Sequence, residues 1–379
     1  MTMSSKTREK LFIVIRAGMD LPVTQVELSD DEYMVIMNLA RRQSLIPIVY
    51  RGLKKMNAPE TRLKTLDQEC IKSKYRSIQH DDSIKKIKSV LDEERISYIP
   101  LKGAVLRNLY PEITLRTSSD IDVLIHEKDV EHAVAKLEDK TDFRKRSQDY
   151  HDISMVNSRV HLELHFNIKE NDEKIDKLLS KAWEYAIPTS EGSMYEFTPE
   201  YQVFHIVAHM SYHFLHGGLG IRPFIDLWLI KRKIVFNTII LEDMLDSCGL
   251  LQFYRESCYL SDVWMCDEKP SETTRLFEDF CLSGGVFGNE RFRIAGSQRK
   301  KRGWRYIGSR VFPPKYQVKE YYKDPNGKEH SLPYYYVKRW RSWLSKDRRT
   351  DLRRQINATV TSDKEYQNTA DELFARLGF

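Results

Sequence analysis

Two aspartates, Asp120 and Asp122, lie one residue apart in the apolar segment TSSDIDVLI, which spans residues 117 to 125. A strand directs alternate side chains to opposite faces, so both carboxylates share one face and the apolar side chains between them face the other way. Two carboxylates at this spacing repel each other unless a cation lies between them. Because Mg²⁺ prefers oxygen ligands, the segment predicts a divalent-cation site on a buried strand.

A third carboxylate follows in HLELHF, residues 161–166, where His161, Glu163 and His165 share one face. Forty-one residues separate Asp122 from Glu163, enough for one helix and two strands to bring the two segments side by side in one sheet. Three carboxylates on neighbouring strands can hold two divalent ions for an in-line displacement at phosphorus. We expect His165 to hold the Glu163 carboxylate in position or to contact the molecule that accepts the phosphoryl group. We expect His161 to be exposed near the start of its strand.

A phosphate-binding turn is predicted upstream, in LKGA, residues 101–104. Lys102 and Gly103 lie where a strand turns into a helix, and backbone N–H groups at such a point favour phosphate. Arg116, four residues before Asp120, is a second cationic group for a triphosphate. The predicted nucleotide-binding residues are Lys102, Gly103, Ala104, Arg116 and Ser119.

Four histidines follow a helical spacing in the segment PEYQVFHIVAHMSYHFLH, at positions 205, 209, 213 and 216. A zinc site is one interpretation of this spacing, but the segment has neither the glutamate of the zincin pattern nor a nearby cysteine. We therefore expect some imidazoles, with His209 as a candidate contact to the acceptor, to line a cleft opposite the sheet. The others are expected to satisfy buried hydrogen bonds.

One acidic residue lies in an otherwise apolar helical segment, RPFIDLWLI, at Asp226. Two interpretations stay open for this carboxylate. It approaches the nucleotide or the acceptor, or it pairs with Arg222 one helical turn back.

The period of the apolar residues divides the chain of 379 residues into four regions. Residues 1–95 have the three- and four-residue spacing of helices, and residues 96–190 alternate between short strands and helices. The helical spacing returns over residues 191–285. Residues 286–379 form a basic, aromatic region that we expect to pack on the body of the protein. The fold class is therefore α/β, of the α+β kind, with helical regions on both sides of a central sheet.

Net charge is +6, and the excess lies in one region. Residues 299–355 contain 18 lysine and arginine residues against 5 acidic ones, interleaved with tyrosine and tryptophan. This region either meets a phosphate-rich partner, such as nucleic acid or an anionic membrane surface, or is a solvated helical surface. No apolar run is long enough to span a membrane, and five cysteines without paired spacing indicate reduced thiols. We expect a cytoplasmic protein with no transmembrane segment.

The segment LKGAVLRNLYPEITLRTSSDIDVLIHEKDVEHAVAKLE, followed by VHLELHF, resembles the nucleotidyltransferase superfamily of the DNA polymerase β type. It is most similar to a bacterial group of uncharacterised nucleotidyltransferase-like proteins, and the resemblance is most specific at residues 101–125. It implies a polymerase β-like core with a mixed sheet, in which Asp120 and Asp122 coordinate Mg²⁺ or Mn²⁺ and Glu163 is the third carboxylate. The superfamily commonly has Gly-Ser where this chain has Gly103-Ala104, and Lys102 is expected to replace the lost hydroxyl contact.

The expected reaction is transfer of a nucleoside monophosphate from an NTP to an acceptor hydroxyl, with release of pyrophosphate. Lys102 and Arg116 would neutralise charge on the leaving pyrophosphate, and Glu163 would hold the second ion or take the proton. The acceptor stays open between a small molecule, a glycan, a protein and an RNA end. Two alternatives stay open as well: a DxD glycosyltransferase that uses a sugar nucleotide, and a non-catalytic protein that binds nucleotide or RNA.

Overall fold

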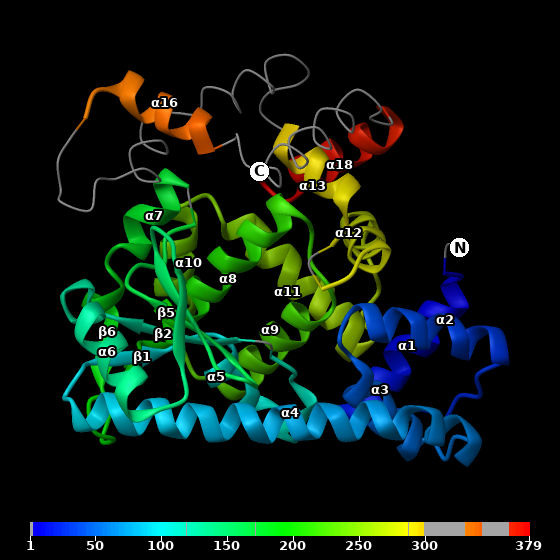
Figure 1. Cartoon of the computed structure of the whole chain (residues 1–379). Coiled ribbons are helices and arrows are strands. Elements are labelled where there is room, and N and C mark those ends of the chain that lie inside the picture. Colours follow the sequence, from blue (N-terminus) through cyan, green and yellow to red (C-terminus); the bar gives the residue numbers. More distant parts are fainter. Residues whose placement is uncertain (1–2, 119, 171, 287, 299–329, 343–363) are drawn as a thin grey trace.

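A computed structural model of the chain describes residues 3–118, 120–170, 172–286, 288–298, 330–342 and 364–379 (Figure 1). Its centre is a five-stranded sheet in the order β1-β2-β5-β4-β3. Strands β2 and β5 pair in parallel, and the other neighbouring strands pair antiparallel. The predicted fold, a mixed sheet flanked by helical regions, is confirmed.

The strands of this sheet are β1 (Tyr98–Pro100), β2 (Asp120–Ile125), β3 (Arg144–Gln148), β4 (Asp152–Val156) and β5 (His161–His165). Strands β2 and β5 match the two strands predicted from the sequence, and β1 is the strand expected before the turn at Lys102. Strand β3 was not predicted, because its residues RKRSQ are exposed and show no alternation of apolar and polar side chains. A separate two-stranded ribbon, β6 (Ala186–Pro188) with β7 (Tyr195–Phe197), was likewise not predicted.

Along the chain, helices both precede and follow the strands of the sheet. The N-terminal helices are α1 (Ser5–Gly18), α2 (Asp30–Arg42), α3 (Ile46–Lys55) and α4 (Glu60–Glu93). Short helices within the sheet region are α5 (Gly103–Leu106), α6 (Val130–Lys140) and α7 (Glu173–Leu179). The later helices are α8 (Pro199–His216), α9 (Arg222–Lys233), α10 (Thr238–Ser247), α11 (Leu251–Cys266), α12 (Glu272–Ser283), α13 (Glu290–Gln298), α16 (Leu332–Ser342) and α18 (Lys364–Arg376).

The apolar face of β2 is buried against α4 and α6. Ile121, Val123 and Ile125 belong to one hydrophobic cluster with Val90 of α4 and Leu137 of α6. Alternation along the strand therefore leaves Asp120 and Asp122 on the opposite face. The burial of one face fixes which side of the sheet carries the carboxylates.

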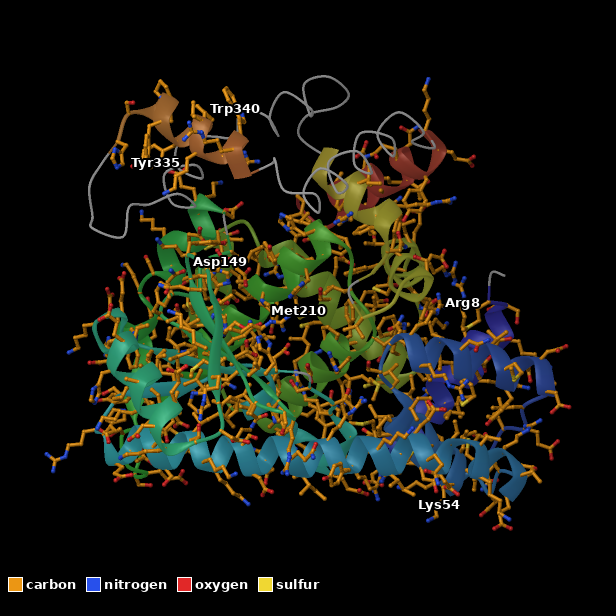
Figure 2. All side chains as sticks on the ribbon, in the orientation of Figure 1. Arg8, Lys54, Asp149, Met210, Tyr335 and Trp340 are labelled. Carbon is orange, nitrogen blue, oxygen red and sulfur yellow. The ribbon has the colours of Figure 1, made fainter. Side chains whose placement is uncertain are left out.

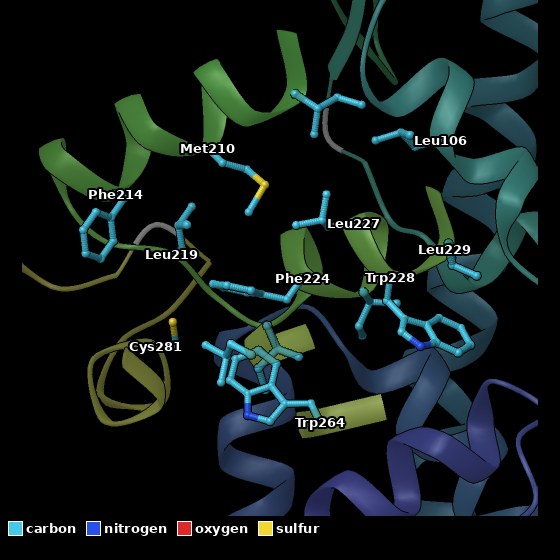
Figure 3. Close-up of a cluster of buried hydrophobic side chains, with 14 of the residues drawn as sticks. Leu106, Met210, Phe214, Leu219, Phe224, Leu227, Trp228, Leu229, Trp264 and Cys281 are labelled. Carbon is cyan, nitrogen blue, oxygen red and sulfur yellow. The ribbon is translucent and has the colours of Figure 1, made fainter. Parts of the chain in front are cut away.

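A second hydrophobic cluster joins the N-terminal helices to helices α8 to α12. Figure 3 shows part of it, in which Met210, Phe214, Phe224 and Trp264 come from α8, α9 and α11. The N-terminal half of α4 contributes to this cluster, and its C-terminal half packs on the sheet, so α4 extends beneath both parts of the molecule (Figure 1). The domain boundaries at residues 95, 190 and 285 stay predictions.

Only part of the basic C-terminal region can be described. Residues 299–329 and 343–363 lie outside the described residues, and so do most of the basic positions in the region 299–355. Tyr335 and Trp340 of α16 lie on the side of the molecule far from Lys54 of α3 (Figure 2). Helix α13 packs on α8, and α18 packs on α12 and α13. Across the described residues, no helix has the length and apolar character needed to cross a membrane.

Helices α1 and α3 cross closely at two glycines. A Cβ atom on Gly52 would lie 2.0 Å from the carbonyl oxygen of Val14, and one on Gly18 would lie 2.1 Å from that of Ile48. Real Cβ atoms do not approach backbone oxygens this closely, so any side chain there forces the helices apart.

We therefore expect Gly52→Ala to lower the free energy of unfolding by about 1–3 kcal/mol, because the new methyl group overpacks the crossing. Urea denaturation followed by circular dichroism measures the change. Lys54→Ala on the exposed face of α3 is the matched control, with an expected change below about 0.5 kcal/mol. Equal stability of the two variants would contradict the close crossing.

Candidate functional site

The parallel pairing of β2 with β5 brings the three predicted carboxylates together. Asp122 is the register partner of Glu163, and Asp120 is the partner of His161. Ligand atoms of Asp122, Glu163 and His165 lie within 4.8 Å of one another, and so do those of Asp120, His161 and Glu163. Glu163 therefore belongs to both groups, and the predicted placement of the two strands side by side is confirmed.

His165 contacts two of the carboxylates. Its Nε2 lies 3.0 Å from Oδ1 of Asp122 and 3.4 Å from Oε2 of Glu163. Burial alone would lower the pKa of His165, but the hydrogen bonds to the two carboxylates outweigh it and raise the pKa to about 8. The expectation that His165 is next to Glu163 is met, and the imidazole is also bonded to Asp122.

His161 does not lie exposed at the strand start, so that expectation is wrong. Its side chain is 30% exposed, and Nδ1 lies 3.3 Å from Oδ1 of Asp120 and 3.7 Å from Oε1 of Glu163. Its Nε2 is hydrogen-bonded to Oγ of Ser154 on the neighbouring strand at 2.6 Å. The parallel register explains the burial, because it places His161 directly beside Asp120.

Lys102 occupies the turn between β1 and α5 in a backbone conformation that L residues rarely adopt, with φ +43°. The turn is closed by the Ala104 N–H, which donates to the Leu101 carbonyl at 3.2 Å. A non-glycine residue held at positive φ stores strain, and such strain clusters at functional sites. The Lys102 Nζ lies 3.6 Å from Oδ1 of Asp122, so the strained turn directs an ammonium group at the carboxylates.

The charges of Lys102 and Asp122 support each other. Burial alone would lower the pKa of Lys102, but Asp122, Glu170 and Glu163 raise it above its usual value. Burial alone would raise the pKa of Asp122, and Lys102 and His165 hold it well below its usual range instead. Asp122 therefore stays ionised and the ammonium group stays protonated near neutral pH.

Gly103 lies close to two side-chain ends beneath this turn. A Cβ atom there would lie 2.8 Å from Oγ of Ser118 and 3.0 Å from Nη1 of Arg116. Helix α5 has only four residues and follows the turn directly, with Ala104 as its second residue. The Ala104 N–H is bonded within the turn, and a helix of four residues adds only a small dipole at this point. Ser119, the remaining predicted nucleotide-binding residue, lies outside the described residues.

Arg116 and Asp226 form a buried, bidentate ion pair. Nε and Nη2 of Arg116 lie 2.8 and 2.9 Å from the two carboxylate oxygens, and the Tyr110 hydroxyl donates to Oδ1 of Asp226 at 2.8 Å. Arg222 instead donates to the backbone carbonyl of Thr117 at 2.7 Å, so it is not the hydrogen-bond partner of Asp226. The pair joins α9 to the loop before β2, while Nη1 of Arg116 lies nearest Gly103.

Two histidines of α8, His205 and His209, lie near enough to Lys102 and Asp122 to interact with their charges, whereas His216 is exposed at the end of the helix. His209 donates from Nδ1 to Oε1 of Glu170 at 2.7 Å, and its Nε2 lies 2.9 Å from Nε2 of His213. Burial lowers the pKa of His209 and of His205 well below the usual value, and the Lys102 charge lowers both further. Across the described residues, the groups that could hold a metal do not include these histidines, so the zinc alternative for α8 finds no support.

Two acidic residues of the site, Glu170 and Asp152, were not predicted from the sequence. Glu170 follows β5 in a loop, and burial raises its pKa while Lys102 opposes that rise. Asp152 begins β4 and is the register partner of His165. The loop around Glu170 has no periodicity that could have indicated its position. The signal that could have placed Asp152 beside His165 is the turn-forming NSR, which joins the strand-like YHDISMV to the strand at residues 161–166.

Removal of the Asp226 carboxylate should leave a buried guanidinium without its partner. We expect Asp226→Ala to lower the free energy of unfolding by about 3–5 kcal/mol. Urea denaturation measures this loss. Asp262→Ala is the control, because Asp262 pairs with Lys231 of the same helix as Asp226 in a half-buried bridge and should cost about 1 kcal/mol or less. Similar losses in both variants would contradict a special role for the Arg116 pair.

The chain belongs to the family described as uncharacterised nucleotidyltransferase, whose model matches residues 30–265. The match extends from α2 to α11 and includes all the site residues described above. No curated protein and no solved structure matches the chain.

Proposed function

We propose that the protein transfers a nucleoside monophosphate from an NTP to an acceptor hydroxyl and releases pyrophosphate. The observation that carries the proposal is the convergence of Asp120, Asp122 and Glu163 on one face of the sheet in a chain of the nucleotidyltransferase family. Carboxylates grouped in this way suit hard divalent cations, and two such ions support in-line displacement at phosphorus.

The donor set fits Mg²⁺ or Mn²⁺. The two groups of ligand atoms share Glu163, so one ion beside Asp120 and one beside Asp122 would both reach its carboxylate. When bound, the ions polarise the transferred phosphate and lower the pKa of the acceptor oxygen. His165 and Lys102 balance the carboxylate charges of Asp122 and Glu163 in the protein alone.

Lys102 and the turn around it are proposed to bind the phosphates. The ammonium group lies at the edge of the carboxylate cluster, where it can pair with a phosphate oxygen as well as with Asp122. The backbone N–H of Gly103 is proposed as a further phosphate contact, whereas the Ala104 N–H is bonded to the Leu101 carbonyl, so Ala104 would act through the shape of the turn. Ser119 is proposed as another contact. Two of the three guanidinium nitrogens of Arg116 bond to Asp226. The third, Nη1, lies beside Gly103, where Arg116 is proposed to contact the phosphates while its pairing with Asp226 holds it in place.

The acceptor is proposed to enter between the sheet and α8. His209 is held by Glu170 on one ring nitrogen and by His213 on the other, so both its ring nitrogens are engaged. His209 therefore fixes Glu170 in place, and the Glu170 carboxylate interacts with the Lys102 charge. Glu163 would hold the second ion or accept the proton of the acceptor hydroxyl. The acceptor itself stays open between a small molecule, a glycan, a protein and RNA.

We propose a cytoplasmic location. All five cysteines are free, which fits a reducing compartment. A phosphate-rich partner for residues 299–355 also stays a proposal, since most of these residues lie outside the described part of the chain.

Asp122→Asn should lower transfer by more than about 100-fold. The change keeps the size of the side chain, but it removes the negative charge with which Asp122 would bind the cation and with which it pairs to His165 and Lys102. The assay incubates the protein with each α-labelled NTP, Mg²⁺ or Mn²⁺, and a cell extract, and follows label transfer and pyrophosphate. Asp139→Asn, on the exposed face of α6, is the matched control and should keep full activity.

Near-full transfer by the Asp122→Asn protein, with a circular dichroism spectrum like that of the wild type, would contradict the proposal. Turnover of a sugar nucleotide without pyrophosphate release would indicate glycosyl transfer instead. Nucleotide binding without any turnover would indicate a non-catalytic protein.

A further inference from the structure

A second group of metal-ligand side chains lies on the far side of His165 from Asp122. Ligand atoms of His151, Asp152 and His165 lie within 4.8 Å of one another. Asp152 is the register partner of His165 across the β4–β5 pair, and His151 directly precedes it. Nε2 of His151 lies 3.1 Å from Oδ2 of Asp152, and the rings of His151 and His165 are stacked with centroids 5.9 Å apart.

Two buried ring nitrogens in this group have nothing to bond within the described part of the chain. They are Nδ1 of His151 and Nδ1 of His165, and the His165 side chain is only 6% exposed. Buried polar atoms are nearly always hydrogen-bonded, and one left unpaired costs about 1–3 kcal/mol. Two buried imidazole nitrogens without a partner, on residues that also group with a carboxylate, therefore point to a ligand that completes the site.

The other edge of the His165 ring already has the arrangement of a metal-bound histidine. Its Nε2 is bonded to the carboxylates of Asp122 and Glu163, so that nitrogen keeps its proton. A metal ion at Nδ1 would displace the second proton of the ring. Histidines that bind metal typically donate their other N–H to a carboxylate in this way.

We propose that His151, Asp152 and His165 bind one divalent transition-metal ion, Zn²⁺ in particular. Two imidazoles and one carboxylate form a donor set that suits Zn²⁺ far better than Mg²⁺, and three protein ligands leave a fourth position for water. This site shares His165 with the group of Asp122 and Glu163, but its other two ligands, His151 and Asp152, belong to neither of the groups proposed to take Mg²⁺. It does not depend on the transfer reaction.

The ion would have a positioning role. It ties the start of β4 to the end of β5 and locks the His165 ring, because Nδ1 is then held by the metal. The Nε2–H of the locked ring stays directed at Asp122 and Glu163. The Zn²⁺ site would in this way orient two carboxylates of the neighbouring cluster.

The test measures Zn²⁺ binding to the full-length protein in excess Mg²⁺, by competition with a chromophoric chelator and by metal analysis after dialysis. We expect one tightly bound Zn²⁺ per chain. His151→Ala and Asp152→Asn should each weaken binding at least about tenfold. Replacement by Co²⁺ should give the visible absorption of a low-coordinate nitrogen and oxygen site, and His151→Ala should change that spectrum.

Two control variants locate the ion. Asp120→Asn alters only the first cluster and should keep the wild-type Zn²⁺ affinity, and so should His132→Ala, which removes a half-exposed histidine on α6. Zn²⁺ should also raise the melting temperature of the wild type and of Asp120→Asn, but not that of His151→Ala. Loss of Zn²⁺ in Asp120→Asn with full binding in His151→Ala would place the ion on the carboxylates and overturn the proposal. Absence of Zn²⁺ binding by the wild type would overturn it as well.

Discussion

The site depends on the parallel register between β2 and β5, which sets Asp122 directly opposite Glu163. Like charges opposite each other on neighbouring strands are destabilising, so the fold accepts this register only with compensation. Two cationic groups supply it: the Lys102 ammonium group from a strained turn, and the His165 imidazole two residues beyond Glu163. The protein alone therefore holds its carboxylates ionised and close together, which is the condition for binding divalent cations.

Two buried polar contacts hold the start of β2 in place. On one side, Arg116 of the preceding loop is bonded to Asp226 of α9. On the other side, Nε2 of His80 in α4 lies 2.9 Å from the backbone carbonyl oxygen of Asp120, and Arg107 is bonded to the second nitrogen of His80. One helix that precedes the sheet in the sequence, α4, and one that follows it, α9, thus hold the same strand. The strands of the sheet are short and bury little surface on their own. Contacts with the surrounding helices therefore help to hold them in place.

Much of this arrangement was predictable from local pattern. Alternation in DIDVLI fixes which face carries Asp120 and Asp122, and the same alternation in HLELHF places Glu163 beside them once the strands pair. Contacts between distant segments were not predictable. The choice between Arg116 and Arg222 as the partner of Asp226 depends on how α9 packs, and Glu170 reaches His209 from a loop without periodicity. Strand β3 was not predicted because all its residues are exposed, so its sequence shows no hydrophobic pattern.

Asp120, Asp122 and Glu163 are proposed to hold divalent cations together against a nucleoside triphosphate. Anomalous diffraction from crystals grown with Mn²⁺ and a non-hydrolysable NTP would locate these ions. We expect Mn²⁺ peaks between the three carboxylates, with the triphosphate lying against the turn at Lys102. Mn²⁺ and triphosphate bound elsewhere, with the three carboxylates still paired only to Lys102, His161 and His165, would contradict this proposal.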